Sequence, residues 1–265
     1  MPVVTASAAL RLARVGLHLL GGGVQIALLF PIAGRPWRDA LKRRWSRQLL
    51  HLLLIEIDAE DPALLGIENG LLVANHVSFV DIFAINSLLP SGFVAKSDVA
   101  TWPLIGWMSR HSDTVFIERG SRKAAHQTQQ QMLSVLASGQ RLAIFPEGTT
   151  TAGDRVLPFH GALFQGAIDA GVPVTALAIE YVDADGCLTA APAYIGDVSL
   201  LDCLLNIVGS GGMQARITLA ARFAPPLQDR RHLAHHAHQA VAAALRRRGT
   251  SEPPQSLRNA AAIIA

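Results

Sequence analysis

Short apolar runs that give way abruptly to polar residues recur through the middle of the chain. Their length and their β-branched and aromatic content predict strands. The predicted strands are Leu71–Asn75, Gly92–Ala95, Thr114–Ile117, Arg141–Phe145, Pro173–Tyr181 and Ala215–Phe223. Helical spacing of apolar residues predicts helices over 79–89, 103–110, 121–138, 161–170, near 199–208 and over 229–247. This alternation predicts an α/β fold in which a mixed, mostly parallel sheet is covered by helices.

The N-terminal part of the chain follows a different pattern. An apolar stretch from Val15 to Ala33 is close to the length that spans a bilayer, although Gly21-Gly22-Gly23 interrupts it. The next segment, Trp37 to Leu54, has the pattern of an amphipathic helix, with tryptophans and leucines along one stripe and arginines elsewhere. A cleaved signal peptide, a single-pass helix, a helical hairpin that dips into one leaflet and an ordinary core helix all fit this pattern. Of these alternatives, we expect stable membrane attachment.

Composition and charge favour a membrane-associated protein. Hydrophobic residues make up 50% of it and charged residues only 16%, and its mean hydropathy is +0.30. Residues 1–50 carry eight basic side chains against one acidic one, Asp39. Basic residues beside anionic headgroups contribute about 1 kcal/mol each, so we expect the cytoplasmic face of the cytoplasmic membrane, the bacterial inner membrane. The predicted organisation is membrane-associated helices at 1–54, an α/β domain at 55–248 and a flexible tail at 249–265, with no nucleic-acid partner.

Neither the cysteines nor the histidine-rich last helix has the spacing of a metal site. Cys187 and Cys203 form no C-x-x-C pair, which favours a reducing compartment without a disulfide framework or structural zinc. His232 and His236 are four residues apart and could share a metal, but no carboxylate joins them at a useful spacing. We therefore expect a solvated or membrane-facing basic face there, and no metal.

Candidate chemistry begins where the first of these strands ends. The apolar run 71–74 breaks into Asn75-His76, and Asp81 follows five residues after the histidine. If the chain turns between them, Asp81 can accept a hydrogen bond from one imidazole nitrogen and leave the other free to take a proton. The spacing from Ser78 to Asp81 also fits a capping box, in which Ser78 caps the next helix and Asp81 reaches back to its backbone. The spacing alone leaves catalysis and capping open.

Two further predicted strands end in polar turns. Glu118-Arg119-Gly120 follows one of them, and Pro146-Glu147-Gly148-Thr149-Thr150 follows the other. Each turn alone is typical of a protein surface. In a parallel sheet, however, such turns meet at one edge, so the three polar turns are predicted to converge at a crevice.

The side chains in these two turns suit a phosphate or a polar head group. Arg119 offers a planar and permanently charged fork for phosphate. Gly148 allows a close approach of the backbone, and threonine hydroxyls add hydrogen-bond donors. Glu147 is placed to orient Arg119 or a substrate hydroxyl.

Together these motifs resemble the glycerolipid acyltransferases typified by bacterial 1-acyl-glycerol-3-phosphate acyltransferase. The motifs, in chain order, are Asn75-His76-x4-Asp81, Phe116-Ile117-x-Arg119-Gly120, Phe145-Pro146-Glu147-Gly148-Thr149 and Val172-Pro173-Val174. The resemblance covers about residues 70–180, and the pairing of the first and third motifs is far more specific than either alone.

The resemblance implies roles for the matching residues. His76 would be the general base that deprotonates the acceptor hydroxyl, and Asp81 would orient it. The residues expected to hold the phosphate or head group of the acceptor are Arg119, Gly120, Glu147, Gly148, Thr149 and Thr150. Pro173 would belong to the motif that shapes the acyl-donor site. The co-substrate would be acyl-CoA or acyl carrier protein, with no other cofactor and no acyl-enzyme, and no G-x-S-x-G nucleophile motif is present in the sequence.

The acceptor expected from the resemblance is 1-acyl-sn-glycerol-3-phosphate, a membrane lipid whose acylation gives phosphatidic acid. One departure weakens this expectation, because Thr150-Thr151 stands where such enzymes usually have Arg-Ser. The Glu147–Asp154 run and the later Tyr194-Ile195-Gly196-Asp197 resemble a subgroup that includes lyso-ornithine lipid acyltransferases. A membrane-associated thioesterase or lipid hydrolase is the alternative from another class, since the same His/Asp pair can activate water.

Overall fold

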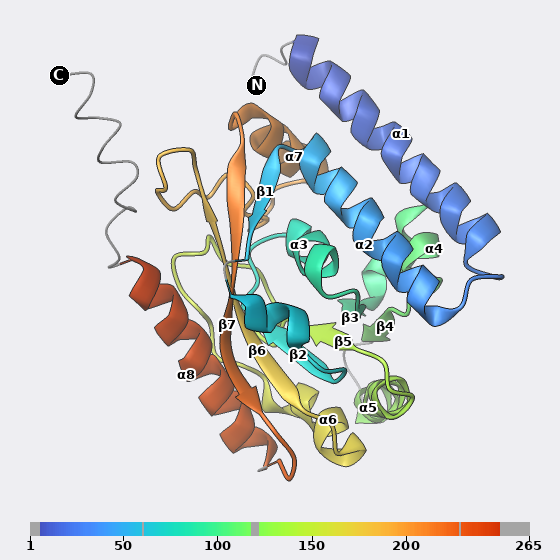
Figure 1. Cartoon of the computed structure of the whole chain (residues 1–265), viewed down its shortest axis with the longest axis vertical. Helices are drawn as coiled ribbons and strands as arrows, with labels where there is room; N and C mark the ends of the chain where they lie inside the picture. Colours follow the sequence, from blue (N-terminus) through green and yellow to red (C-terminus); the bar gives the residue numbers. More distant parts are fainter. Residues whose placement is uncertain (1–5, 60, 118–121, 228, 250–265) are drawn as a thin grey trace.

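The computed structural model of the chain describes residues 6–59, 61–117, 122–227 and 229–249. Its strands form one seven-stranded sheet in the order β1-β7-β6-β2-β5-β3-β4 (Figure 1). They are β1 (Ile55–Asp58), β2 (Leu71–Ala74), β3 (Gly92–Lys96), β4 (Val115–Ile117), β5 (Leu142–Ile144), β6 (Val174–Val182) and β7 (Met213–Phe223). Neighbouring strands are parallel except β6 and β7, which are antiparallel. The strands from β6 to β4 therefore all end at one edge of the sheet, here called the carboxyl edge, and begin at the opposite amino edge.

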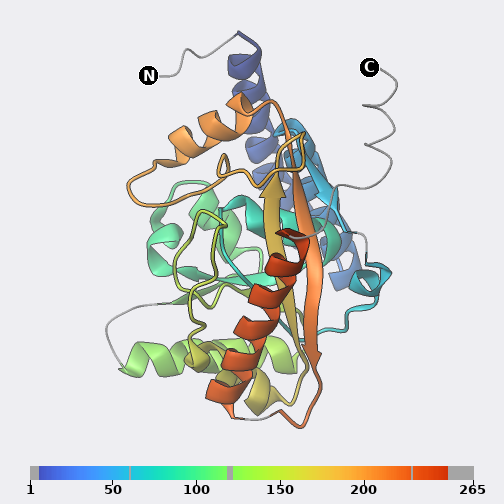
Figure 2. The ribbon, with the colours of Figure 1, turned by 90° about the vertical axis from the view of Figure 1, so that its left-hand side faces the viewer.

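Helices cover both faces of this sheet (Figures 1 and 2). On one side lie α1 (Ala6–Leu29), α2 (Arg35–Leu52), α3 (Val80–Leu88), α4 (Ile105–Arg110) and α7 (Leu200–Gly209). On the other lie α5 (Arg122–Ala137), α6 (Gln165–Ala170) and α8 (Arg230–Gly249). Short 3₁₀ turns, η1 (Pro62–Gly66), η2 (Ser97–Thr101) and η3 (Gly161–Phe164), complete the described elements.

The core is divided by the sheet into two hydrophobic clusters. Along β6, Leu177, Ile179 and Tyr181 belong to the cluster under α2, α3 and α7, whereas Ala176 and Ala178 belong to the cluster under α5, α6 and α8. Side chains alternate between the faces of a strand, and both faces are covered here. All nine residues of β6 are therefore buried.

The predicted fold class is confirmed. Apart from 161–170, every strand and helix predicted after residue 70 is present, with ends that agree to within one or two residues. One correction concerns 161–170, which is a 3₁₀ turn followed by a shorter α-helix. Leu163 N donates to His160 O, three residues back, and this tighter bond defines the 3₁₀ turn. Strand β1 was not among the predicted strands, and it pairs with β7, more than 150 residues away in the chain.

Helices α1 and α2 form an antiparallel hairpin on one side of the sheet (Figure 1). A Cβ atom at Gly22 would lie 2.5 Å from Trp45 Nε1, so the glycine triplet makes room for the tryptophan. The Trp45 ring stacks on His18 with 4.9 Å between ring centroids. The predicted amphipathic helix is present as α2, and its buried leucines, Leu49 and Leu50, pack in the cluster that also holds the core residues of α3.

The outward face of α1 is apolar. Leu10, Leu17, Leu20, Val24 and Leu28 are each more than half exposed. By length and composition α1 qualifies as a membrane-spanning helix, and a signal sequence meets the same criterion. Because only 22% of its most apolar window is buried, α1 differs from the core helix of a soluble protein, and its apolar surface weakly indicates membrane association.

A group of ion pairs at the amino edge ties α2 to the sheet. Lys42 Nζ lies 2.6 Å and Arg35 Nη1 3.3 Å from Asp113 Oδ2, just before β4. Arg35 also donates to the side chain of Gln140, just before β5. Burial tends to raise the pKa of Asp113, but Lys42 and then Arg35 and Arg38 outweigh it, so the pKa lies below its ordinary value.

Candidate active site

The predicted pairing of His76 with Asp81 is present at the carboxyl edge. Strand β2 ends at Ala74, and the chain turns before α3 begins at Val80. This turn brings His76 Nδ1 to 2.8 Å from Asp81 Oδ2. A carboxylate that accepts from Nδ1–H fixes the tautomer in which Nε2 carries a free lone pair. The imidazole is thus prepared to take a proton at Nε2.

Asp81 is held by backbone amides as well as by the histidine. The amide groups of Val77 and Ser78 donate to the same oxygen, Oδ2, at 2.8 and 2.9 Å. The half of the capping box in which Asp81 reaches back to Ser78 is therefore confirmed, and it coexists with the contact to His76. The other half is wrong: the Ser78 hydroxyl is buried and has no hydrogen-bond partner among the described residues, and it is the Ser78 carbonyl that accepts from Asp81 N, at 3.1 Å.

Asn75 fastens the start of this turn to the neighbouring strand. Its side-chain Nδ2 donates to Ile179 O and its Oδ1 accepts from Ile179 N, both at 2.8 Å. The amide thus occupies the place of one more residue in the β2 ladder after that strand has ended. The register between β6 and the His76 turn is fixed as a result.

Glu147 connects the third motif to the first. Its Oε1 accepts from His76 N and its Oε2 accepts from Leu157 N, both at 2.8 Å. The residue is buried, and this burial raises the pKa of Glu147 even though both backbone hydrogen bonds lower it. In this arrangement both carboxylate oxygens brace the backbone of the site.

Phe145 supports the imidazole from one side. The rings of His76 and Phe145 are stacked, with 4.0 Å between centroids and 6° between planes. The His76 side chain keeps 21% of its surface exposed. One ring face is therefore covered by Phe145 and Nδ1 is engaged by Asp81, while the side chain as a whole remains partly exposed.

The Gly-Thr-Thr turn lies beside this pair. Gly148 has φ +70°, a left-handed conformation that favours glycine, and a Cβ there would come within 3.3 Å of the His160 ring. Thr149 is exposed. The Thr150 hydroxyl donates to Tyr194 O. The next residue, Thr151, donates from its amide to His76 O at 2.9 Å.

The predicted convergence of polar turns is confirmed for the turns after β2 and β5, which are neighbouring parallel strands. Arg119 and Gly120 lie outside the described residues. The strand before them, β4, is parallel to the others and ends at the same edge, three strands from β2. The predicted roles of these two residues stay predictions.

The structure does not bring Pro173 to His76. Pro173 stands at the amino edge, where its carbonyl accepts from Leu71 N at 3.0 Å. Its ring also packs where a Cβ at Gly70 would fall, 3.1 Å away. His76 lies five residues farther along that strand direction, roughly 17 Å at 3.3 Å per residue. The acyl-donor role of Pro173 therefore stays a prediction, without support from proximity.

Three residues at the site were assigned no role from the sequence. The sequence motifs contain Asn75 and Phe145 but predict no function for them, and Tyr181 stands at the end of a predicted strand. The Tyr181 hydroxyl donates to Asp81 Oδ1 at 2.6 Å, across 100 residues of chain. A period-two strand pattern does signal that Tyr181 is buried, but the sequence carries no signal for what its hydroxyl contacts.

Two surface cavities lie away from these residues, along α8. One of about 180 Å³ is lined by residues that include Phe159, Arg231 and His235, and one of about 260 Å³ by residues that include Phe223 and His236. The rings of His232 and His236 are 4.0 Å apart, and among the described residues no group of three potential metal ligands occurs. Neither cavity includes His76 or Asp81.

Comparisons with known proteins indicate the family and the fold. A family model described as Acyltransferase matches residues 58–180, the segment that contains the His76 turn and Glu147. The chain is 45% identical over 150 residues to a 1-acyl-sn-glycerol-3-phosphate acyltransferase of Neisseria meningitidis, an alignment that spans 56% of this chain and 58% of the relative. In structure it is similar to the crystal structure of the 1-acyl-sn-glycerophosphate acyltransferase PlsC from Thermotoga maritima. That likeness has a TM-score of 0.64 at 19% identity and covers 92% of this chain and all of the other, which shows the same fold.

Another relative matches along nearly the whole chain. The chain is 38% identical over 257 residues to a lyso-ornithine lipid O-acyltransferase of Pseudomonas aeruginosa, covering 95% of this chain and 97% of the relative. A match of this extent includes α1, α2 and α8 as well as the motif-bearing segment. The chain therefore belongs to the acyltransferase family.

Proposed function

We propose that the chain is an O-acyltransferase that moves a fatty acyl group from an acyl thioester to the free hydroxyl of a lysophospholipid-type acceptor. The observation that carries this proposal is the His76 Nδ1 to Asp81 Oδ2 contact of 2.8 Å within a segment that matches the acyltransferase family. This pair supplies a base, and the reaction needs no nucleophile from the protein.

In the proposed reaction the acceptor hydroxyl gives its proton to His76 Nε2 while its oxygen attacks the thioester carbonyl carbon. Asp81 stabilises the imidazolium that forms. When the tetrahedral intermediate collapses, the carbon–sulfur bond breaks and the leaving sulfur takes the proton back from Nε2. The products are the new oxygen ester and a free thiol, and the protein is returned to its starting state.

For the acceptor we propose 1-acyl-sn-glycerol-3-phosphate, which the Neisseria meningitidis relative is named for. Arg119, Gly120 and the exposed Thr149 are the residues proposed to contact its head group. Thr150 already donates to Tyr194 O, so it contributes by shaping the turn.

A second acceptor, lyso-ornithine lipid, is favoured by a specific observation. The relative of that name aligns with 95% of this chain, whereas the Neisseria meningitidis relative aligns with 56%. Thr150-Thr151 also stands where an arginine would have offered an additional contact to phosphate. The chemistry at His76 is the same for both acceptors.

We propose that the protein works on the cytoplasmic face of the bacterial inner membrane, where acyl-CoA or acyl carrier protein can supply the acyl group. The exposed apolar face of α1 and the eight basic side chains in residues 1–50 support this location. No cofactor besides the co-substrate is proposed.

The test uses the purified full-length chain in vesicles. Palmitoyl-CoA or palmitoyl-acyl carrier protein is added with either 1-acyl-sn-glycerol-3-phosphate or lyso-ornithine lipid. Free thiol is followed over time, and the lipid products are identified by mass spectrometry. Acceptor-dependent thiol release with a matching diacyl product is expected, and the product identifies the acceptor.

Two results would contradict the proposal. Free fatty acid released equally with and without acceptor indicates a hydrolase. No thiol release with any donor and acceptor pair, in vesicles where the Neisseria meningitidis relative is active, removes the acyltransferase assignment.

A further inference from the structure

We propose that Tyr181 is a positioning residue of the reaction. Its hydroxyl donates to Oδ1 of Asp81, the carboxylate oxygen that does not contact His76, and thereby sets the basicity of His76. The proposal rests on the proposed function, because it concerns how the same base is tuned. It adds Tyr181, which is 100 residues away in the sequence, to the pair formed by His76 and Asp81, which are five residues apart.

The two oxygens of Asp81 have different surroundings. Oδ2 accepts from His76 Nδ1 and from two backbone amides, those of Val77 and Ser78. Oδ1 accepts from the Tyr181 hydroxyl at 2.6 Å. Asp81 is fully buried and Tyr181 nearly so, at 0% and 1% exposure. Without the phenol, a buried carboxylate oxygen would lose a short, charge-assisted hydrogen bond.

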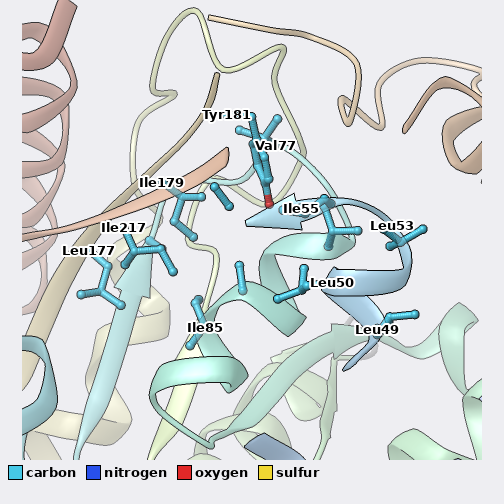
Figure 3. Packing of buried hydrophobic residues seen from close by; sticks show 14 of the residues in the cluster. Leu49, Leu50, Leu53, Ile55, Val77, Ile85, Leu177, Ile179, Tyr181 and Ile217 are labelled. Carbon is cyan, nitrogen blue, oxygen red and sulfur yellow. The ribbon is translucent and has the colours of Figure 1, made fainter. Parts of the chain in front are cut away.

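The sheet accounts for how Tyr181 reaches Asp81. Ala74, the last residue of β2, is in register with Leu177 of β6, so β6 continues beyond its neighbour. Asn75 pairs with Ile179, and the next residue on the same face of β6 is Tyr181. Figure 3 shows the Tyr181 ring among the aliphatic side chains of the core, with its hydroxyl oxygen at the tip. The extension of β6 thus places the Tyr181 hydroxyl in an apolar region, where it reaches Asp81 at the His76 turn.

A donor on Oδ1 affects His76 through the carboxylate. The phenol withdraws part of the negative charge of Asp81, so it weakens the hydrogen bond that Oδ2 accepts from Nδ1 and reduces the charge available to an imidazolium. It also prevents rotation of the carboxylate, which keeps Oδ2 aligned with Nδ1. The phenol itself stays protonated, because burial and then the charge of Asp81 hold the pKa of Tyr181 well above its ordinary value.

Tyr181→Phe removes only the hydroxyl. We expect kcat to fall by about tenfold, by analogy with the loss seen when the outer partners of metal-ligating histidines are removed, while KM for both substrates changes less than twofold. Loss of the donor makes Asp81 a stronger acceptor, so the acid limb of the kcat/KM profile should move to higher pH. Thr175→Val is the matched control, because it removes a buried hydroxyl from the same face of β6 near the opposite end of the strand. An unchanged kcat and pH profile in Tyr181→Phe, or the same change in Thr175→Val, overturns the proposal.

A second measurement applies the opposite perturbation without deleting a group. The chain has two tyrosines, so in a Tyr194→Phe background 3-fluorotyrosine labels Tyr181 alone. Fluorine makes the phenol a stronger donor, and the pKa of His76 should move down relative to the unlabelled Tyr194→Phe protein. That pKa is read by NMR of ¹⁵N-labelled histidine, with the His76 signal assigned by its loss in His76→Ala.

This NMR measurement needs no substrate, so it separates the two proposals. Shifts in opposite directions for Phe and fluorotyrosine support the role of Tyr181, even if the assays find no acyl transfer. If fluorination leaves the pKa of His76 unchanged or raises it, the positioning role is wrong, even if the enzyme is active.

Discussion

The two edges of the sheet hold carboxylates in opposite ways. At the carboxyl edge, Asp81 and Glu147 accept from backbone amides, with one imidazole and one phenol as additional donors to Asp81. At the amino edge, Asp113 lies between the charged groups of Lys42 and Arg35. The neutral donors at the carboxyl edge fix the position of Asp81 without neutralising it, so its charge remains available to His76. At the amino edge, Lys42 and Arg35 neutralise the charge of Asp113, and these ion pairs attach α2 to the sheet. The first arrangement suits chemistry and the second suits stability.

The largest expected effect comes from removing His76, the proposed base. In His76→Ala, kcat should fall by about 10²–10⁴-fold, the range that general-base catalysis supplies. The free energy of unfolding, measured in urea, should change little, because the side chain is partly exposed and Glu147 binds the backbone of residue 76. Retained turnover would show that the carboxyl edge is not the reaction centre.

Asp81→Asn should have the next largest effect on turnover. An amide can still accept backbone hydrogen bonds, but it no longer stabilises the imidazolium or imposes the Nδ1–H tautomer, so we expect a loss of up to about 10⁴-fold in kcat. Asp81→Glu keeps the charge and displaces it by one methylene. Near-normal activity in Asp81→Glu would indicate that Asp81 serves only as a cap for α3.

Glu147→Gln tests whether a carboxylate can act purely as a brace. Both oxygens of Glu147 face backbone N–H groups, and a glutamine would direct its NH₂ at one of them. We expect the free energy of unfolding to fall by about 1–3 kcal/mol, and kcat to fall as the backbone of His76 shifts. A raised KM for the acceptor with unchanged kcat would instead indicate direct contact with the substrate.

Asp113→Asn should leave turnover within twofold and act on stability alone. Its pKa is lowered in the folded protein, so its contribution is present above its unfolded pKa of about 3.9 and is lost as the pH falls through the lower folded value. At pH 7 we expect a loss of about 1–2 kcal/mol, less than for a fully buried pair because Asp113 is partly exposed. The difference from the wild type should shrink below pH 4.

Glu147 should affect the pH dependence of stability in the opposite direction to Asp113. Burial raises its pKa, so its ionisation costs stability above the folded pKa, and that cost disappears as the pH falls below the unfolded value of about 4.3. Urea unfolding between pH 3 and pH 6 of Asp113→Asn and Glu147→Gln should therefore show pH slopes that differ from the wild type in opposite directions. Changes of the same sign would mean that the two edges do not differ in this way.

The sequence predicts the elements of this structure well, because apolar periodicity reports directly on which face is covered. Thus 71–75 and 173–181 were expected as strands, and β2 and β6 are found there. It also predicts that His76 meets Asp81, because both lie on one short turn. The motif resemblance brought Glu147 to the site but suggested contact with the substrate or with Arg119, whereas its oxygens accept from backbone amides.

What the sequence could not predict depends on register between distant segments. The Tyr181 contact exists because β6 extends past β2, and nothing in either segment alone specifies that offset. Likewise, the sequence shows Gly22 only as an interruption of an apolar stretch. Its role, which is to make room for the Trp45 ring, depends on where α2 places that tryptophan. Pairing partners of this kind are set by tertiary packing, and local periodicity carries no information about it.

The attachment of the His76 turn to β6 has a consequence for how the protein acquires activity as it folds. The contacts that complete the turn join residues 71, 100 and 104 positions apart, although His76 and Asp81 are only five apart. Closing such long loops is entropically costly and slow compared with forming local turns. We therefore expect His76, the proposed base, to reach its final geometry only after β6 has entered the sheet. The appearance of turnover during refolding should then report closure of the central strands rather than formation of the turn.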